Sequence, residues 1–394
     1  MKFIHLSDIC IGNPIESGRR WDKDRSTELL DSLRNLLAKA EEDGVDLVMI
    51  TGGLFAHIPA IEELEAVNDL FKAHSGIYIV IIAGKTDIVA GSSPVRSFEW
   101  SSNVRYVLEP SVQRIVLDKI GTEIFAASYC SVLEAEVNTI KEKPPILPFR
   151  DMQEGEGEET ETVLVERLKN AEPKKFSEAA EAYPDSEEIR IAMLCPEDES
   201  EAERAFTGSE FSYVAFGGKS SQKEIIKDMA YCPGTFEPED SRDTGEHGAM
   251  EGEIYEETGR LEHIEFLPLA GLSYVTLNIK ISPKTTAEEL TSSVRKELIK
   301  RGEKNIYRLR LTGSRAPEED LKLDSIKETF RINEVINETV PEYDYVELFK
   351  EHPQDMIGFY ISSIVNRKKE MSQIEKKAMF YGLEALLKTS ENED

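Results

Sequence analysis

The sequence has few cysteines, no long apolar run and far fewer basic than acidic side chains. Its four cysteines (Cys10, Cys130, Cys195 and Cys232) lie far apart and none belongs to a CxxC pair. This spacing argues against a disulfide framework and against a structural zinc finger. No apolar stretch approaches the length that spans a bilayer, and residues 1–6 lead into a predicted strand without a secretory signal. We therefore expect a cytoplasmic protein without membrane association.

The shortage of positive charge bears on nucleic-acid binding. The chain has 47 Lys and Arg against 76 Asp and Glu, which gives a formal net charge of −29. Affinity for nucleic acids comes largely from Lys and Arg that neutralise phosphates. The composition therefore does not predict autonomous DNA binding, although a local basic face or a basic partner would supply it. A hydrophobic content of 40% over 394 residues is otherwise that of a globular protein with room for two or three domains.

Short apolar runs alternate with helical patterns at the start of the chain. Strands are predicted at 3–6, 46–50 and 77–82, and helices at 25–43 and 61–73. This order predicts parallel crossover units and an α/β fold. Ligands bind at the carboxyl ends of the strands in such sheets. The turns that follow the strands are therefore where we expect functional residues.

The remaining chain changes character three times. A core at 1–268 is predicted to contain an exposed excursion at about 135–187, which includes an acidic segment at 151–162. Alternating strands on either side of a helix then predict a small α+β domain at 269–335, and 336–394 is predicted to be mainly helical.

The strand-end turns form an ordered series. They read IHLSDICIG (4–12), VDLVMITGGLF (45–55), IVIIAGKTD (79–87), IAMLCPED (191–198) and YVAFGGKS (213–220), followed by YCPGTFE (231–237) and DTGEHG (243–248). In this order they resemble the calcineurin-like metallophosphoesterase superfamily, and within it the SbcD-type DNA-repair exonuclease subunits. The resemblance spans roughly residues 1–265. The later segments PLAGLSYVTLNI and YRLRLTG are similar to the capping domain of the SbcD-like YhaO group.

The resemblance implies a particular fold and chemistry. The expected architecture is α/β, a metallophosphoesterase-type sandwich of mixed sheets flanked by helices, with a small α+β capping domain and C-terminal helices. Family members hold two Mn- or Mg-type divalent ions about 4 Å apart, which clamp a phosphodiester and activate water. The ligands are supplied by the motifs DxH, GD, GNHD, a strand-end His and GHxH.

Most of these motifs are altered in this chain. Only Asp8 keeps its expected ligand residue, and Gly53 replaces the carboxylate that bridges both ions. Glycine has no side chain to coordinate a metal, and the ammonium of Lys85 repels cations. We therefore expect no two-metal site, no catalytic residues and no cofactor, as in a pseudoenzyme. The vestigial pocket positions are Asp8, Cys10, Gly53, Lys85, Thr86, Asp87, Cys195, Gly218 and Ser220.

Two hypotheses address what replaces the metals. In the first, Lys85 and Lys219 form buried ion pairs with Asp8 and Asp87, since an isolated buried carboxylate is unfavourable; the alternative is that both lysines point to solvent. In the second, Cys10 takes part in a zinc site.

The zinc hypothesis rests on thiolates, which favour zinc over manganese or magnesium. Its ligands are Asp8, Cys10 and Cys195, with His57 or Cys232 to complete the set. The competing interpretation is that the cysteines are small buried packing residues.

Other candidate residues have simpler interpretations. His5 is expected to be a core residue and His247 to have a structural role in its turn. Arg308 and Arg310 alternate on one strand, which is typical of a solvated strand face but also suits contact with a phosphate backbone.

Three functions follow from these observations. The first is a catalytically inactive SbcD-like subunit that scaffolds or regulates an SMC-like, SbcC-type coiled-coil ATPase in DNA processing. It would contact DNA through that complex and would pair as a homodimer if it follows the family. The second is a nuclease or phosphodiesterase with a rearranged metal site of Asp8, Cys10, Asp87 and Cys195. The third is an anion-binding protein that uses the vacated pocket.

The C-terminal segment is where the resemblance places the ATPase contact. Its apolar side chains either anchor that partner or pack on the chain's own core. They are Tyr345, Leu348, Phe349, Ile357, Phe359 and Tyr360.

Overall fold

The structure, a computed structural model, describes residues 1–13, 21–89, 93–129, 146–148, 172, 174–184, 189–219, 221–317, 320–365 and 373–391. The chain divides into two compact units, Met1–Ser273 and Tyr274–Asp394. The predicted first boundary, at 268/269, lies five residues earlier. The predicted acidic segment at 151–162 lies outside the described residues.

The first sheet of the N-terminal unit has six strands in the order β13-β12-β1-β2-β3-β4. The strands from β1 to β4 run parallel, β12 is antiparallel to β1, and β13 is antiparallel to β12, so the sheet is mixed. The bounds are β1 Lys2–Leu6, β2 Leu47–Thr51, β3 Tyr78–Ile82, β4 Val104–Val107, β12 Ala249–Tyr255 and β13 Arg260–Leu267. The three strands predicted at the start of the chain are therefore confirmed, each to within one residue.

The second sheet has seven strands in the order β10-β11-β9-β8-β6-β5-β7 and is also mixed. Its centre, β9-β8-β6, is parallel. The bounds are β5 Gln113–Leu117, β6 Thr122–Ala126, β7 Ile146–Pro148, β8 Ile189–Leu194, β9 Tyr213–Phe216, β10 Lys223–Ile226 and β11 Ala230–Cys232.

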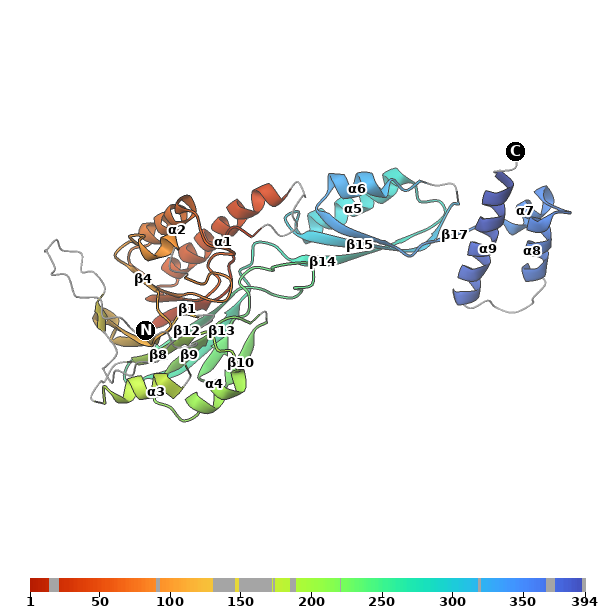
Figure 1. Cartoon of the computed structure of the whole chain (residues 1–394). Helices are drawn as coiled ribbons and strands as arrows, with labels where there is room; N and C mark the ends of the chain where they lie inside the picture. The colour runs from red at the N-terminus through yellow and green to blue at the C-terminus, as the bar shows by residue number, and fades with distance from the viewer. Residues whose placement is uncertain are drawn as a thin grey trace. The chain divides into compact units, whose positions relative to one another are not determined.

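The two sheets pack face to face with helices on their outer sides (Figure 1). Alternate residues of the strands fill the core between the sheets, as Leu47 and Met49 do on β2 and Ile191 and Met193 on β8. Apolar stripes of α1 (Asp22–Glu42) and α2 (Ile61–Ala73) cover the first sheet, and those of α3 (Lys174–Glu181) and α4 (Glu199–Phe206) cover the second. The N-terminal unit is thus an α/β sandwich of mixed sheets flanked by helices.

The predicted excursion at 135–187 is partly wrong. It contains β7, which pairs with β5, and α3, which packs on the second sheet. The buried residues of α3 are Phe176, Ala179 and Ala180, at the spacing of one helical face. Two of these three are alanines among charged neighbours, so the apolar stripe is too weak to identify from sequence.

The C-terminal unit begins with a parallel sheet, β14-β15-β16, onto which β17 adds. Helices α5 and α6 supply the crossovers and pack on the sheet (Figure 1). Because both crossovers are helical and the strands parallel, this part is α/β rather than the α+β domain predicted. The bounds are β14 Tyr274–Ile281, α5 Ala287–Arg301, β15 Ile306–Arg315, α6 Leu323–Thr329, β16 Ile332–Asn337 and β17 Val340–Pro341.

Three helices end the described chain: α7 (Tyr345–Glu351), α8 (Met356–Val365) and α9 (Gln373–Glu391). They share a small apolar core centred on Ile357, Ile361 and Leu383. None of the described helices, here or elsewhere in the chain, combines the length and apolarity needed to cross a bilayer.

Candidate functional site

The five turns predicted from the sequence meet at the carboxyl ends of β1, β2, β3, β8 and β9. The β1 turn is joined to the β2 turn by hydrogen bonds from Asp8 N to Gly52 O (2.9 Å) and from Cys10 N to Gly53 O (2.7 Å). The β3 turn joins them because Asp87 accepts a hydrogen bond from Gly53 N. The β8 turn joins them because Cys195 Sγ donates to Thr51 O, and the β9 turn because Gly218 N donates to Ser7 Oγ. The sequence order of the turns therefore becomes a single spatial cluster.

Asp8 is the centre of this cluster. It is only 7% exposed, its backbone is left-handed (φ 54°), and its Oδ2 accepts a hydrogen bond of 2.5 Å from Ser7 Oγ. Burial, together with the nearby carboxylates of Asp87 and Glu239, raises the pKa of Asp8 to about 7. A carboxylate is thus held in a pocket that does little to stabilise its charge.

Gly53 cannot be replaced by a larger residue without rearrangement. A Cβ atom at this position would lie 2.2 Å from Asp8 Oδ1 and 2.7 Å from Asp8 Cα, and the backbone is left-handed (φ 65°). The Asp8 carboxylate therefore occupies the space that a side chain on the β2 turn would need.

Asp87 is a structural carboxylate. It accepts backbone hydrogen bonds from Gly53 (3.0 Å), Leu54 (3.0 Å) and Gly84 (2.6 Å), and a fourth from the Tyr106 hydroxyl (3.3 Å). Burial raises its pKa, and the backbone donors oppose that rise. With its oxygens engaged, Asp87 clamps the β2 turn to the β3 turn.

The β8 and β9 turns are closed by backbone contacts. Cys195 Sγ donates to Thr51 O (3.3 Å), and burial raises the pKa of this thiol well above its usual range. A Cβ at Gly217 would lie 1.7 Å from the same carbonyl oxygen, whereas Gly218 has more room. Ser220, the last predicted pocket position, lies outside the described residues.

The predicted lysine ion pairs do not form in the described structure. Lys85 is exposed and its Nζ lies 5.7 Å from the centroid of the Tyr129 ring, while Thr86 beside it is also exposed. Lys219 Nζ instead pairs with Glu199 Oε2 at 3.8 Å. Since an exposed ammonium keeps its hydration, the alternative interpretation, in which the lysines turn to solvent, describes Lys85 better.

The predicted zinc ligands are only partly brought together. The ligand atoms of Asp8, Cys10 and Glu239 all lie within 4.8 Å of one another, but Cys195 is not a member of this group. His57 is exposed and lies 3.2 Å from Glu63, and Cys232 packs in the core beneath α4. Glu239, two residues beyond the 231–237 motif, was missed because no spacing rule relates it to Cys10.

The residues present do not fit a pair of divalent ions. Asp8 accepts hydrogen bonds from Ser7 Oγ and from the Gly218 backbone, Asp87 accepts from three backbone N–H groups, and Gly53 leaves no side chain to bridge two ions. Cys195 is a protonated thiol that donates to a carbonyl rather than a basic ligand. This pocket therefore lacks the metal ligands, the bridging carboxylate and the free space that two-metal phosphodiester chemistry needs.

His5 supports the floor of the pocket, as predicted for a core residue. Its Nδ1 lies 2.9 Å from the Tyr213 hydroxyl and its Nε2 lies 2.8 Å from Thr51 Oγ1. Burial lowers the pKa of His5 from 6.5 to about 3. The folded protein therefore keeps this imidazole neutral under ordinary conditions.

This depressed pKa predicts acid sensitivity. Below pH 6.5 the unfolded chain binds a proton at His5 that the folded chain does not, so the free energy of unfolding falls as the pH decreases towards 3. When the pH falls from about 7 to about 5, we expect the free energy of unfolding, measured in urea, to decrease by about 2 kcal/mol more in the wild-type protein than in a His5→Gln variant. Equal losses in the two proteins would show that His5 is protonated in the folded state.

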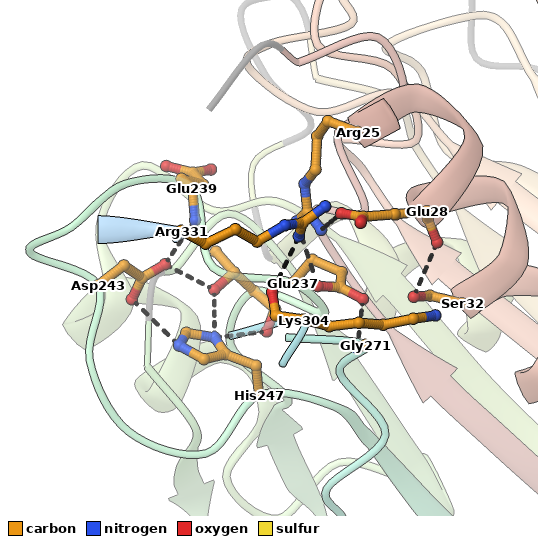
Figure 2. A network of polar contacts seen from close by, with 11 residues as sticks. Arg25, Glu28, Ser32, Glu237, Glu239, Asp243, His247, Gly271, Lys304 and Arg331 are labelled. Carbon is orange, nitrogen blue, oxygen red and sulfur yellow. Dashed lines mark hydrogen bonds and ion pairs between the residues drawn. The ribbon is translucent and has the colours of Figure 1, made fainter. Parts of the chain in front are cut away.

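A second polar network lies beside the pocket (Figure 2). The buried Glu237 accepts from Arg25 Nη2 (3.1 Å) and from the backbone N–H of Gly271 (2.7 Å), which joins helix α1 to the end of the N-terminal unit. His247 is buried with Nδ1 2.9 Å from Thr235 Oγ1 and Nε2 3.6 Å from Asp243 Oδ1. These contacts agree with the structural role predicted for His247.

The arginines predicted on the capping strand are paired within their own sheet. Arg308 Nε lies 2.6 Å from Glu334 Oε2, and Arg310 donates two hydrogen bonds of 3.0 Å to Glu338. Arginines held by carboxylates are less suited to phosphate contact, so the solvated strand face is the better interpretation.

No description of a known protein family matches this sequence, and no curated protein matches it either.

Proposed function

We propose that this chain is a catalytically inactive, SbcD-like member of the metallophosphoesterase superfamily that scaffolds or regulates an SbcC-type coiled-coil ATPase in DNA processing. The α/β sandwich and the meeting of the five motif turns at one edge of its sheets support the finer assignment to a metallophosphoesterase-type fold. Turns that follow separate strands come together in the way that a strand-end site requires.

The observation that carries the proposal is the position of the Asp8 carboxylate against Gly53. The family's chemistry needs a carboxylate on the β2 turn that bridges two ions. In this chain a Cβ on Gly53 would lie 2.2 Å from Asp8 Oδ1, so the bridge is missing and its space is filled. A pocket in which the Asp8 carboxylate fills the place of the missing bridging ligand suits a protein that keeps the fold for binding rather than for catalysis.

The other two functions have weaker support. A rearranged nuclease site needs Asp87 and Cys195 as ligands, but Asp87 accepts three backbone hydrogen bonds and Cys195 donates to Thr51 O. An anion site needs Lys85 and Lys219 as counter-charges, but Lys85 turns to solvent and Lys219 pairs with Glu199.

The first experiment is a hydrolysis assay of the full chain with manganese on single-stranded and double-stranded DNA and on a simple phosphodiester. We expect rates equal to the buffer control. Hydrolysis that requires manganese and disappears in an Asp8→Ala variant would overturn the proposal.

The C-terminal helices divide the predicted partner anchors into two groups. Tyr345, Leu348 and Tyr360 pack against the helices' own core, of which Ile357 is a member. Phe349 and Phe359 are exposed, and Val346, Met356 and Tyr381 join them as large exposed apolar side chains on the same three helices. We assign the proposed ATPase contact to this second group, because its large apolar side chains are exposed and are therefore available to a partner.

This assignment predicts the effect of Phe359→Glu. The side chain is 65% exposed, so the substitution removes an apolar contact with the partner without opening the core. We expect capture of a co-expressed SbcC-type ATPase to fall at least about tenfold, since one central anchor contributes roughly 2 kcal/mol or more. Ile299→Glu on α5, at a residue 63% exposed, is the matched control and should leave capture unchanged. Equal effects of the two variants would show that the ATPase does not bind at these helices.

A further inference from the structure

We propose that the outer edge of strand β4 binds an extended peptide in which acidic side chains flank an apolar one. This binding site goes beyond the function proposed above and does not depend on it. β4 is a strand of four residues at the end of the first sheet, and among the described strands it pairs with β3 alone. A strand at the edge of a sheet offers its free backbone groups to a strand from another chain.

The backbone of β4 has hydrogen-bonding groups that point away from the sheet. Ile79 N donates to Asn103 O (2.8 Å), so alternate residues of β4, beginning with Arg105, bond to β3. The residues between them, Val104 and Tyr106, turn their carbonyl groups outward, and Tyr106 also turns its N–H outward. An added strand would pair with these groups.

A cavity beside this edge can receive an apolar side chain. Its volume is about 300 Å³, which is large enough for an aromatic ring. The Trp100 ring stacks on Tyr106 with the centroids 5.7 Å apart and meets Phe98 edge-on at 4.9 Å. The apolar residues that line the cavity are Val95, Phe98, Trp100, Val104, Tyr106 and Leu108.

Trp100 also supplies a hydrogen-bond donor that lacks a partner. Its Nε1 is buried, and no described residue accepts a hydrogen bond from it. Buried indole N–H groups normally have an acceptor, because an unsatisfied buried donor is unfavourable. A main-chain carbonyl of a peptide that lies along β4 would be such an acceptor.

The wall of the site is fixed before any ligand binds. A second cavity, of about 390 Å³, shares residues 99–102 with the first. Ser101 N donates to Asn68 Oδ1 (2.8 Å), and Asn103 Nδ2 donates to Phe71 O (3.1 Å). These hydrogen bonds attach the shared segment to helix α2, and a preorganised wall loses less conformational entropy on binding.

The charges around the two cavities favour an acidic ligand. The lining contains three basic residues, Lys72, Arg96 and Arg105, and one acidic residue, Glu99. Glu109 pairs with Arg96 (2.9 Å), and even with this residue included the basic side chains outnumber the acidic ones. The chain as a whole has a formal net charge of −29, so a local excess of positive charge is the exception. Opposite charges on the ligand would steer it to this edge.

Tryptophan fluorescence tests the site directly. The chain has two tryptophans, so a Trp21→Phe variant of the full chain leaves Trp100 as the only one. The probe is a synthetic peptide with a central phenylalanine between valines, flanked by glutamates on both sides. We expect its saturable binding to shift the Trp100 emission. A peptide with lysines in place of the glutamates, and one with an N-methylated backbone, should bind at least about tenfold more weakly.

Two substitutions test the proposed contacts, with binding followed by the anisotropy of a fluorescein-labelled peptide. Lys72→Glu should weaken binding about fivefold or more, because it replaces an attraction with a repulsion. Lys227→Glu, at a residue 85% exposed between β10 and β11, changes the net charge equally and should leave the affinity unchanged. Trp100→Phe keeps an aromatic ring but removes the donor and should weaken binding about fivefold. Urea unfolding checks that each variant is folded.

Three results would overturn the proposal. Equal affinity for the glutamate and lysine peptides, or an unchanged affinity in Lys72→Glu, would exclude an acidic ligand. Equal affinity for the N-methylated peptide would exclude strand pairing. A chain that sediments as a dimer and becomes a monomer in Lys72→Glu would show that a second copy, rather than a peptide, occupies this edge.

Discussion

A Gly53→Asp substitution, which restores the carboxylate expected of an active family member, should destabilise this protein and restore no activity. The new Cβ would lie 2.2 Å from Asp8 Oδ1, and the left-handed backbone (φ 65°) disfavours any side chain. The substitution also buries a second carboxylate against Asp8, whose pKa is already raised to about 7 by burial and by its acidic neighbours. Overpacking, backbone strain and like-charge burial together should lower the free energy of unfolding by more than about 4 kcal/mol.

Two further variants separate these causes. Gly44→Asp places the same side chain at φ 69° with no atom within 4 Å of the added Cβ. Its loss of unfolding free energy, about 1 kcal/mol, therefore measures the cost of the left-handed backbone alone. Gly53→Ala keeps the steric conflict without the charge and should give an intermediate loss. Urea unfolding of the three variants gives the comparison. A Gly53→Asp protein as stable as wild type, or one that gains manganese-dependent hydrolysis, would show that the pocket is not closed.

The sequence predicted where the pocket would form but not how its residues would bond. Alternating strands and helices placed the turns after β1, β2 and β3 at one edge of a parallel sheet, and the contacts of Asp8, Gly53 and Asp87 confirm it. Lys85 was predicted to replace a metal because its position in the motif is a ligand position. Its side chain is long and strongly hydrated, so local rotamer freedom rather than motif position decides where it points.

The same limit explains which features were missed. Glu239 reaches Cys10 only because the strands β1 and β11 belong to sheets that pack face to face, which no local pattern encodes. Helix α3 was missed because Phe176 is its one large buried side chain. Residues that act through long-range packing therefore escape sequence patterns even where the strands around them are predicted to within a residue.

Removing the carboxylate of Glu237 should destabilise the protein far more than removing an exposed ion pair of equal length. Arg25 Nη2 lies 3.1 Å from Glu237 Oε2, with both side chains almost fully buried (4% and 1% exposed). In Glu237→Ala the guanidinium of Arg25 stays buried without its main partner, and the backbone N–H of Gly271 loses its acceptor. We expect the free energy of unfolding to fall by roughly 3–5 kcal/mol, measured by urea unfolding.

Burial, rather than the ion pair as such, is the reason for this effect, and the chain offers a control that tests the distinction. Arg301 and Glu297 on α5 also lie 3.1 Å apart, but their side chains are 45% and 33% exposed. Glu297→Ala should therefore change the free energy of unfolding by no more than about 0.5 kcal/mol. A double variant, Arg25→Met with Glu237→Met, should lose less than Glu237→Ala, because two apolar side chains leave no unpaired charge in the core. If the loss of unfolding free energy in the double variant instead equals the sum of the losses in Arg25→Met and in Glu237→Met, Arg25 and Glu237 act independently. The link between α1 and the Gly271 segment then does not depend on their pairing.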